Sequence, residues 1–161
     1  MFPWYRNVGG AGSVGLLVLR IAVGAALIIH GSSKIHDDTG WKFENATSWM
    51  NKFPDPPPPY LQAAAIVAEF GGGISLVLGL LTPLFCLMIA CTMATAYAMV
   101  HHRAQHPFVA SKPGDPSFEL AAAYFAAAVC LLLVGPGQFS LDHCIFGRRS
   151  ASKGLPPYTG P

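Results

Sequence analysis

The sequence contains few charged residues. Only 11% of its 161 residues are Asp, Glu, Lys or Arg, whereas soluble domains carry about 25%. Hydrophobic residues make up 52% of the chain, and the mean hydropathy is +0.43. This composition excludes an ordinary soluble domain and predicts a single membrane domain over residues 1–161. The formal net charge of +2 is too small to indicate nucleic acid as a partner, so we expect membrane lipids as the surroundings.

The sequence also lacks the motifs of resident cofactors. It has no flavin, haem or nucleotide fingerprint, and its carboxylates do not occur in the Glu-x-x-His pairs of di-iron bundles. No CxxC pair is present, and we interpret the cysteines as small buried hydrophobic residues, namely Cys86, Cys91, Cys130 and Cys144. We therefore expect no metal and no cofactor of the chain's own. Electron transfer would need a quinone or a cofactor on a partner chain, and a quinone or a lipid is the candidate ligand.

Four apolar spans cover about half of the chain, at residues 13–33, 60–81, 83–100 and 118–134. A helix of about 20 residues crosses the ~30 Å hydrocarbon core of a bilayer. The connections are a polar loop ending in four prolines, a tight Thr82-Pro83 junction and a second polar loop, and a tail follows at 138–161. We predict an all-α integral membrane protein, an antiparallel four-helix bundle.

Four spans place both chain ends on the same side of the membrane. That side carries four basic residues and the loop side five, so the positive-inside rule does not decide the orientation. We expect a multi-pass protein of the bacterial inner membrane with cytoplasmic termini.

Glu69 is the most unusual residue, because it lies within an apolar span. A buried acid in a membrane helix is costly and usually has a partner. The glycines that follow it, Gly71, Gly72 and Gly73, would let another helix backbone approach closely. At ~1.5 Å per residue, Glu69 lies about 13 Å from the loop side and His30 about 5 Å.

Several polar residues from all four spans fall near the loop side or within reach of it. We propose them as one ligand-binding or structural network: Arg20, His30, Lys34, Glu69, His101, His102 and Glu119. Arg20 lies deeper, but we expect its long side chain to reach Glu69. Glu69, Arg20 and His30 are thus predicted to be connected.

Each of these residues has a structural and a functional interpretation. Glu69 and Arg20 could form an ion pair that fixes helix register, or belong to a ligand or proton-relay site. His30 could be a satisfied buried histidine, contact a quinone head group or another ligand, or bind a metal or haem. His101 and His102 could simply be interfacial histidines.

Three segments together resemble the DoxX family of small four-helix membrane proteins. They are LRIAVGAALIIHGSSKI, AEFGGGISLVLGLLTP and LLLVGPGQFSLD, and the resemblance covers most of residues 16–142. The characteristic positions are Arg20, His30, Gly31, Lys34, Glu69, Gly72, Gly79, Leu80, Thr82 and Asp142. The resemblance implies the fold. It also implies possible roles, because some relatives are the membrane subunit of a thiosulfate:quinone oxidoreductase, and others look like partners of thiol or superoxide-defence enzymes.

Three functions are compatible with these observations. The first is an accessory or anchoring subunit of a larger, redox or electron-transfer membrane complex. The alternative is a quinone-linked oxidoreductase membrane subunit, similar to thiosulfate:quinone oxidoreductase, with a buried His/Glu/Arg site. A small-molecule carrier is the weakest, because the four spans show no inverted repeat.

We expect the partners to be other integral membrane subunits. The contacts would be made by Trp4 and Tyr5, by the proline-rich tail, and by outward-facing alanines of the fourth span. The alternative is that these alanines face only lipid and that the tail is a floppy segment without a partner.

Overall fold

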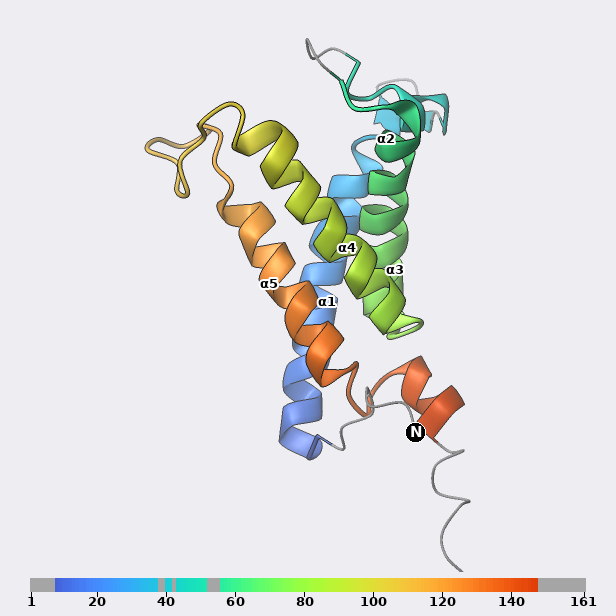
Figure 1. Cartoon of the computed structure of the whole chain (residues 1–161). Coiled ribbons are helices and arrows are strands. Elements are labelled where there is room, and N and C mark those ends of the chain that lie inside the picture. Colours follow the sequence, from blue (N-terminus) through green and yellow to red (C-terminus); the bar gives the residue numbers. More distant parts are fainter. Residues whose placement is uncertain (1–7, 38–39, 42, 52–55, 148–161) are drawn as a thin grey trace, which may run out of the picture.

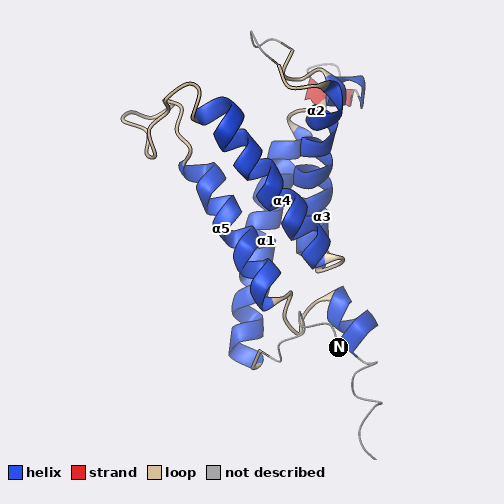
Figure 2. Cartoon of the chain, viewed as in Figure 1, coloured by secondary structure: helices blue, strands red, loops and turns tan. Residues whose placement is uncertain are grey.

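The computed structural model describes residues 8–37, 40–41, 43–51 and 56–147. The α-helices are α1 (Gly10–Ser32), α2 (Pro59–Ile66), α3 (Gly72–Leu78), α4 (Thr82–Ala96) and α5 (Glu119–Val134). Three π-helical segments are η2 (Val67–Gly71), η3 (Tyr97–His101) and η4 (His143–Gly147), and η1 (Phe43–Thr47) is a 3₁₀-helix. A two-stranded antiparallel ladder joins β1 (His36–Asp37) to β2 (Gly40–Trp41). Figure 2 shows that helices dominate the structure.

These helices form four rods. α2, η2 and α3 follow one another without a break, as do α4 and η3, so the rods are α1, Pro59–Leu78, Thr82–His101 and α5. Consecutive rods run in opposite directions, with α1 beside α3 and α4 beside α5 (Figure 1). The predicted all-α bundle of four antiparallel helices is confirmed.

The first three rods, of 20 to 23 residues, are long and apolar enough to cross a membrane. The fourth, α5, is apolar but only 16 residues long, or about 24 Å. Large apolar side chains such as Val18, Ile29, Leu84 and Leu133 lie on the outside of the rods. In a bundle surrounded by lipid, such side chains meet a medium as apolar as themselves.

Glycines bring α1 and the second rod into close contact. A Cβ atom on Gly24 would lie 2.7 Å from the carbonyl oxygen of Gly73, and one on Gly31 would lie 2.5 Å from the backbone nitrogen of Phe70. Gly72 faces the other way, where a Cβ would meet Ile89 of α4 at 3.0 Å. The predicted close helix approach beside Glu69 is therefore present on both sides of the second rod.

The two ends of the bundle differ in construction. We call "loop end" the end that carries the connections from α1 to α2 and from η3 to α5, and "turn end" the end at Gly79–Leu81. At the loop end, Gln62 is 1% exposed and holds the α1–α2 connection. Its side chain accepts from the Met50 backbone N–H and donates to Asn51 Oδ1 and Pro57 O, each at 2.9 Å.

At the turn end, the segment after α5 caps the start of α4. The Asp142 carboxylate accepts hydrogen bonds from the backbone N–H groups of Leu81 at 2.7 Å and Thr82 at 2.8 Å. The Asp142 N–H donates to Gly79 O at 2.8 Å. A carboxylate at a helix N-terminus satisfies amides that have no partner within the helix and interacts favourably with the helix dipole.

Two sequence expectations need correction or lie outside the described residues. Only Cys86 is buried, whereas Cys91, Cys130 and Cys144 are exposed on the protein, because apolar membrane residues can face lipid as well as a core. Trp4, Tyr5 and residues 148–161 lie outside the described part of the chain.

Candidate functional site

Glu69 is paired with Lys34. The Lys34 ammonium lies 2.5 Å from both carboxylate oxygens of Glu69, and the two side chains are 18% and 8% exposed. Lys34 stands in the turn directly after α1, so it can bend toward the second rod. The same ammonium lies 4.2 Å from the ring centre of Trp49, a distance typical of a cation–π contact. The pair neutralises the buried acid, as a carboxylate in a membrane helix requires.

Both residues border a cavity of about 230 Å³ at the loop-end half of the bundle. All four rods and the approach to α5 contribute to it. It is lined by Leu27, His30, Lys34, Glu69, Met93, Ala96, His101, Ser117, Leu120, Ala121 and Tyr124. We call it the polar cavity, because six of these side chains can donate or accept hydrogen bonds.

Two of the lining residues belong to π-helical segments. Glu69 lies in η2 and His101 ends η3. A π-helical turn changes the direction in which the following side chains point, and such turns occur frequently at functional sites. Within the described residues, the two π-helical turns of the membrane rods thus both contribute a titratable side chain to the polar cavity.

The histidines have aromatic and polar neighbours. The rings of His30 and Tyr124 meet edge to face, with centres 5.8 Å apart and planes at 73°. His101 Nδ1 lies 3.1 Å from His106 Nδ1. Because a hydrogen bond between two Nδ1 atoms needs one bare nitrogen, at least one of these imidazoles is neutral. His30 itself is exposed on the protein, so it borders the cavity and is not enclosed by other side chains of this chain.

Arg20 lies apart from this group, which corrects the predicted Arg20–Glu69–His30 network. It is fully buried at the turn end. Its guanidinium donates to Leu76 O at 3.4 Å and also to Phe139 O. Arg20 precedes Lys34 by fourteen residues, or about 20 Å along a helix, so its side chain is too far away to join the loop-end pair.

His102 and Glu119 do not line the polar cavity. Both are exposed on the protein, and the His102 ring packs 5.9 Å from Tyr97. Of the seven residues proposed from sequence, the structure thus brings together His30, Lys34, Glu69 and His101.

Sequence reasoning missed three polar side chains near the site. Tyr124 and Ser117 line the polar cavity, and His106 contacts His101. Tyr124 follows Leu120 and Ala121 at helical spacing on α5, so those neighbours offered a signal for a common face. Ser117 and His106 lie in an irregular connection, where no periodicity indicates direction. Among the described residues, no group of three His, Cys, Asp or Glu side chains is arranged to hold a metal ion.

Comparison with known proteins identifies the family of the chain. The DoxX family model matches residues 15–102, which is more than half of the chain. The chain belongs to the DoxX family. It is 33% identical over 139 residues to the inner membrane protein YphA of Escherichia coli strain K12, a match that covers 86% of this chain and 95% of YphA. No solved structure matches the chain.

The DoxX-matched region contains four lining residues with titratable groups, His30, Lys34, Glu69 and His101. Tyr124 and Ser117 lie beyond it. Together with the membrane-length helices and the inner membrane relative, the family assignment makes this DoxX protein a multi-pass integral protein of the inner membrane.

Proposed function

We propose that the protein is a membrane subunit of a larger redox assembly and that its polar cavity binds the head group of a membrane quinone. The observation that carries this proposal is the convergence of His30, His101 and Tyr124 on a cavity. Among the described residues, the acid and the base that line it, Glu69 and Lys34, form a pair. An ion pair adds no net charge to the cavity. The site therefore suits an uncharged ligand with hydrogen-bond acceptors better than an anion or a cation.

A quinone head group has this chemistry. Its two carbonyl oxygens accept hydrogen bonds, and the hydroxyl of Tyr124 and the ring nitrogens of the histidines can donate them. Reduction of a quinone to a quinol takes up two electrons and two protons. The protons would reach the ring oxygens from groups that carry N–H or O–H protons, such as the His101 ring and the Tyr124 hydroxyl, and would be replaced from water at the loop end. The two electrons would come from a redox cofactor on a partner subunit.

The size of the cavity supports a head group rather than a complete lipid. Sites for drug-sized ligands usually measure about 300–1,000 Å³, and the polar cavity is smaller, at about 230 Å³. The competing interpretation is that the Lys34–Glu69 pair only fixes the packing of α1 on η2. The two interpretations differ when a lining group outside the pair is changed. A ligand site should then lose affinity for its ligand, whereas a pair that only fixes helix packing predicts no such loss.

Purification in mild detergent tests both parts of the proposal. We expect larger redox subunits and a stoichiometric quinone to accompany the wild-type chain. Tyr124→Phe removes one hydroxyl from the polar cavity, so the variant should keep its subunits and retain less quinone than the wild type. The matched control is Glu119→Gln, which changes an exposed polar residue of the same helix outside the cavity and should keep both. A folded chain that purifies alone and without quinone would contradict the proposal.

A further inference from the structure

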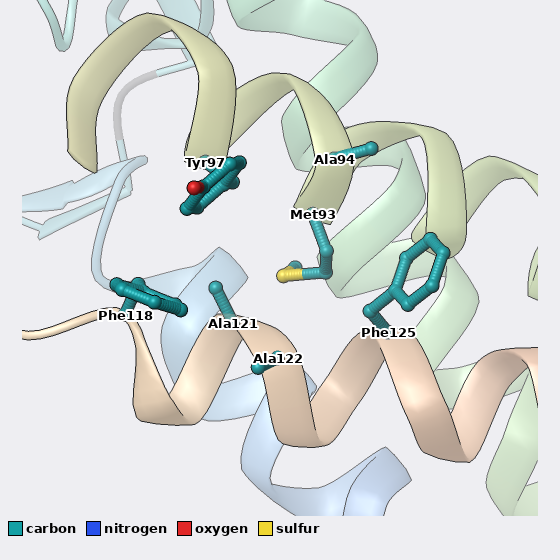
Figure 3. Close-up of a pocket in the computed structure, with 7 residues that line it drawn as sticks. All are labelled: Met93, Ala94, Tyr97, Phe118, Ala121, Ala122 and Phe125. Carbon is teal, nitrogen blue, oxygen red and sulfur yellow. The ribbon is translucent and has the colours of Figure 1, made fainter. Parts of the chain in front are cut away.

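A second, apolar space lies between α4 and α5. This cleft measures about 310 Å³ and is lined by Met93, Ala94, Tyr97, Phe118, Ala121, Ala122 and Phe125. Figure 3 shows the four larger side chains, Met93, Tyr97, Phe118 and Phe125, placed around the small Ala121 and Ala122. We call it the apolar cleft. The alanines account for the space, because larger side chains at those positions would fill it.

The apolar cleft and the polar cavity adjoin each other. Met93 and Ala121 line both spaces. Met93 stands on α4 and Ala121 on α5, so the shared boundary lies between these two helices. A methionine side chain is unbranched and adaptable, and alanine leaves little to obstruct a passage. A ligand with a polar head and an apolar chain could occupy both spaces at once.

Aromatic side chains bound the apolar cleft toward the loop end. The Tyr97 and Phe118 rings have centres 5.0 Å apart, with planes at 65°. Phe108 packs on Phe118 in the same manner, at 5.1 Å. On the outer side, Tyr97 is 43% and Phe125 42% exposed. Tyr97 belongs to a rod of membrane length, so we infer that this outer side faces lipid.

We propose that the apolar cleft holds the first part of a quinone's isoprenoid chain, and that quinone enters the polar cavity from the lipid between α4 and α5. The inference rests on the proposed function and adds the route and the substrate class, a quinone with a long isoprenoid chain. The polar cavity alone is smaller than most ligand sites, whereas the two adjoining spaces together reach the usual range.

Filling the apolar cleft without touching the polar cavity tests this route. Ala122 lines only the cleft, so Ala122→Phe should obstruct the chain and leave the head-group site intact. The matched control is Ala123→Phe, the same change one residue later at an exposed position outside both spaces. If Ala122→Phe fails to fold, Ala94→Phe obstructs the same cleft from α4.

The measurement is the dissociation constant of two probes for the purified chain in lipid nanodiscs. One probe is a benzoquinone with a long isoprenoid chain, and the other carries the same ring with a methyl group in place of the chain. We expect Ala122→Phe to weaken the long-chain probe by about tenfold or more. The methyl probe should change by less than about twofold, and Ala123→Phe should change neither.

Two outcomes would overturn the inference in distinguishable ways. If both probes bind the wild-type chain and Ala122→Phe weakens both equally or neither, the proposed function stands and the route is wrong. If neither probe binds the wild-type chain, the proposed function fails and the route fails with it. If the wild-type chain binds neither quinone probe and purifies with a phospholipid alone, an acyl chain is the occupant and both proposals fail.

Discussion

The two ends of the bundle both bury charge, but they use it differently. At the turn end, Arg20 donates to the backbone carbonyls of Leu76 and Phe139, and Asp142 accepts from the backbone N–H groups of Leu81 and Thr82. At the loop end, Lys34 and Glu69 contact each other beside an open cavity. Charges bound by backbone atoms hold helices in place. Charges beside a cavity remain accessible to a ligand.

The buried charges at the two ends also differ in how much empty space lies beside them. Gly79 has φ +66°, and a Cβ atom there would lie 1.9 Å from Nη1 of Arg20, so the guanidinium is packed directly against the backbone. The polar cavity instead leaves about 230 Å³ among the loop-end side chains. A buried charge without adjoining space is structural, whereas one that borders a cavity is a candidate for ligand contact.

Arg20→Met should have the largest effect on stability. It removes the donors to two carbonyl groups and leaves the Asp142 charge without the nearby guanidinium. Removing one partner from a buried charged network costs about 3–5 kcal/mol. We expect a large loss of folded protein in detergent, measured by size-exclusion chromatography and thermal unfolding. Exposed Lys112→Met is the control, and equal stability of the two variants would contradict a structural role for the turn end.

Glu69→Gln should have an intermediate effect on the free energy of unfolding. It breaks the ion pair and leaves the Lys34 ammonium beside an uncharged amide. Hydrogen bonds to charged groups contribute about 1.5–3 kcal/mol, and the pair is partly exposed, so we expect the lower part of that range. The double variant Lys34→Met, Glu69→Gln should recover part of the loss, which a double-mutant cycle measures. Additive losses would indicate that the two side chains do not interact.

Asp142→Asn should destabilise the turn end by about 1 kcal/mol. The amide keeps one oxygen that can accept from Leu81 or Thr82, but the negative charge at the α4 N-terminus is lost. Thermal unfolding checks the change, and quinone binding should be unaffected because Asp142 is remote from the polar cavity. A change in quinone affinity as large as that of a cavity variant would show that the two ends are not independent.

Tyr124→Phe should have the smallest effect on stability and a clear effect on ligand binding. The ring packing on His30 is retained, so the free energy of unfolding should change by less than about 1 kcal/mol. If the lost hydrogen bond to the ligand contributes about 1.4 kcal/mol, quinone binding should weaken about tenfold. Isothermal titration in nanodiscs gives the affinity, and a variant that binds as tightly as the wild type would remove Tyr124 from the site.

Part of this structure could be predicted from the sequence. Long apolar runs separated by proline-rich or polar connections are sufficient to indicate four antiparallel helices. Lys34 follows His30 by four residues, so their place on one face was predictable, and both line the polar cavity. The glycines after Glu69 correctly indicated a close helix approach.

The partners of the charged residues could not be predicted. The reach of its side chain suggested that Arg20 meets Glu69. Arg20 lies near the middle of α1, however, and its guanidinium donates to the backbone carbonyls of Leu76 and Phe139 at the turn end. Asp142 is a single acid in a polar tail, and the amides that it caps lie 60 and 61 residues earlier in the chain. Such long-range pairings depend on how the rods pack, and local sequence patterns do not predict that packing.

The most direct test of the account is the thermal shift that a quinone with a methyl group in place of its chain produces in three proteins. A ligand that binds only the folded state stabilises it by about 2.7 kcal/mol at 100 times its dissociation constant. We predict a full shift in the wild type, a full shift from a lower starting temperature in Asp142→Asn, and a reduced shift in Tyr124→Phe. A shift that is reduced equally in Asp142→Asn and Tyr124→Phe, or absent from the wild type, would contradict a quinone site at the loop end.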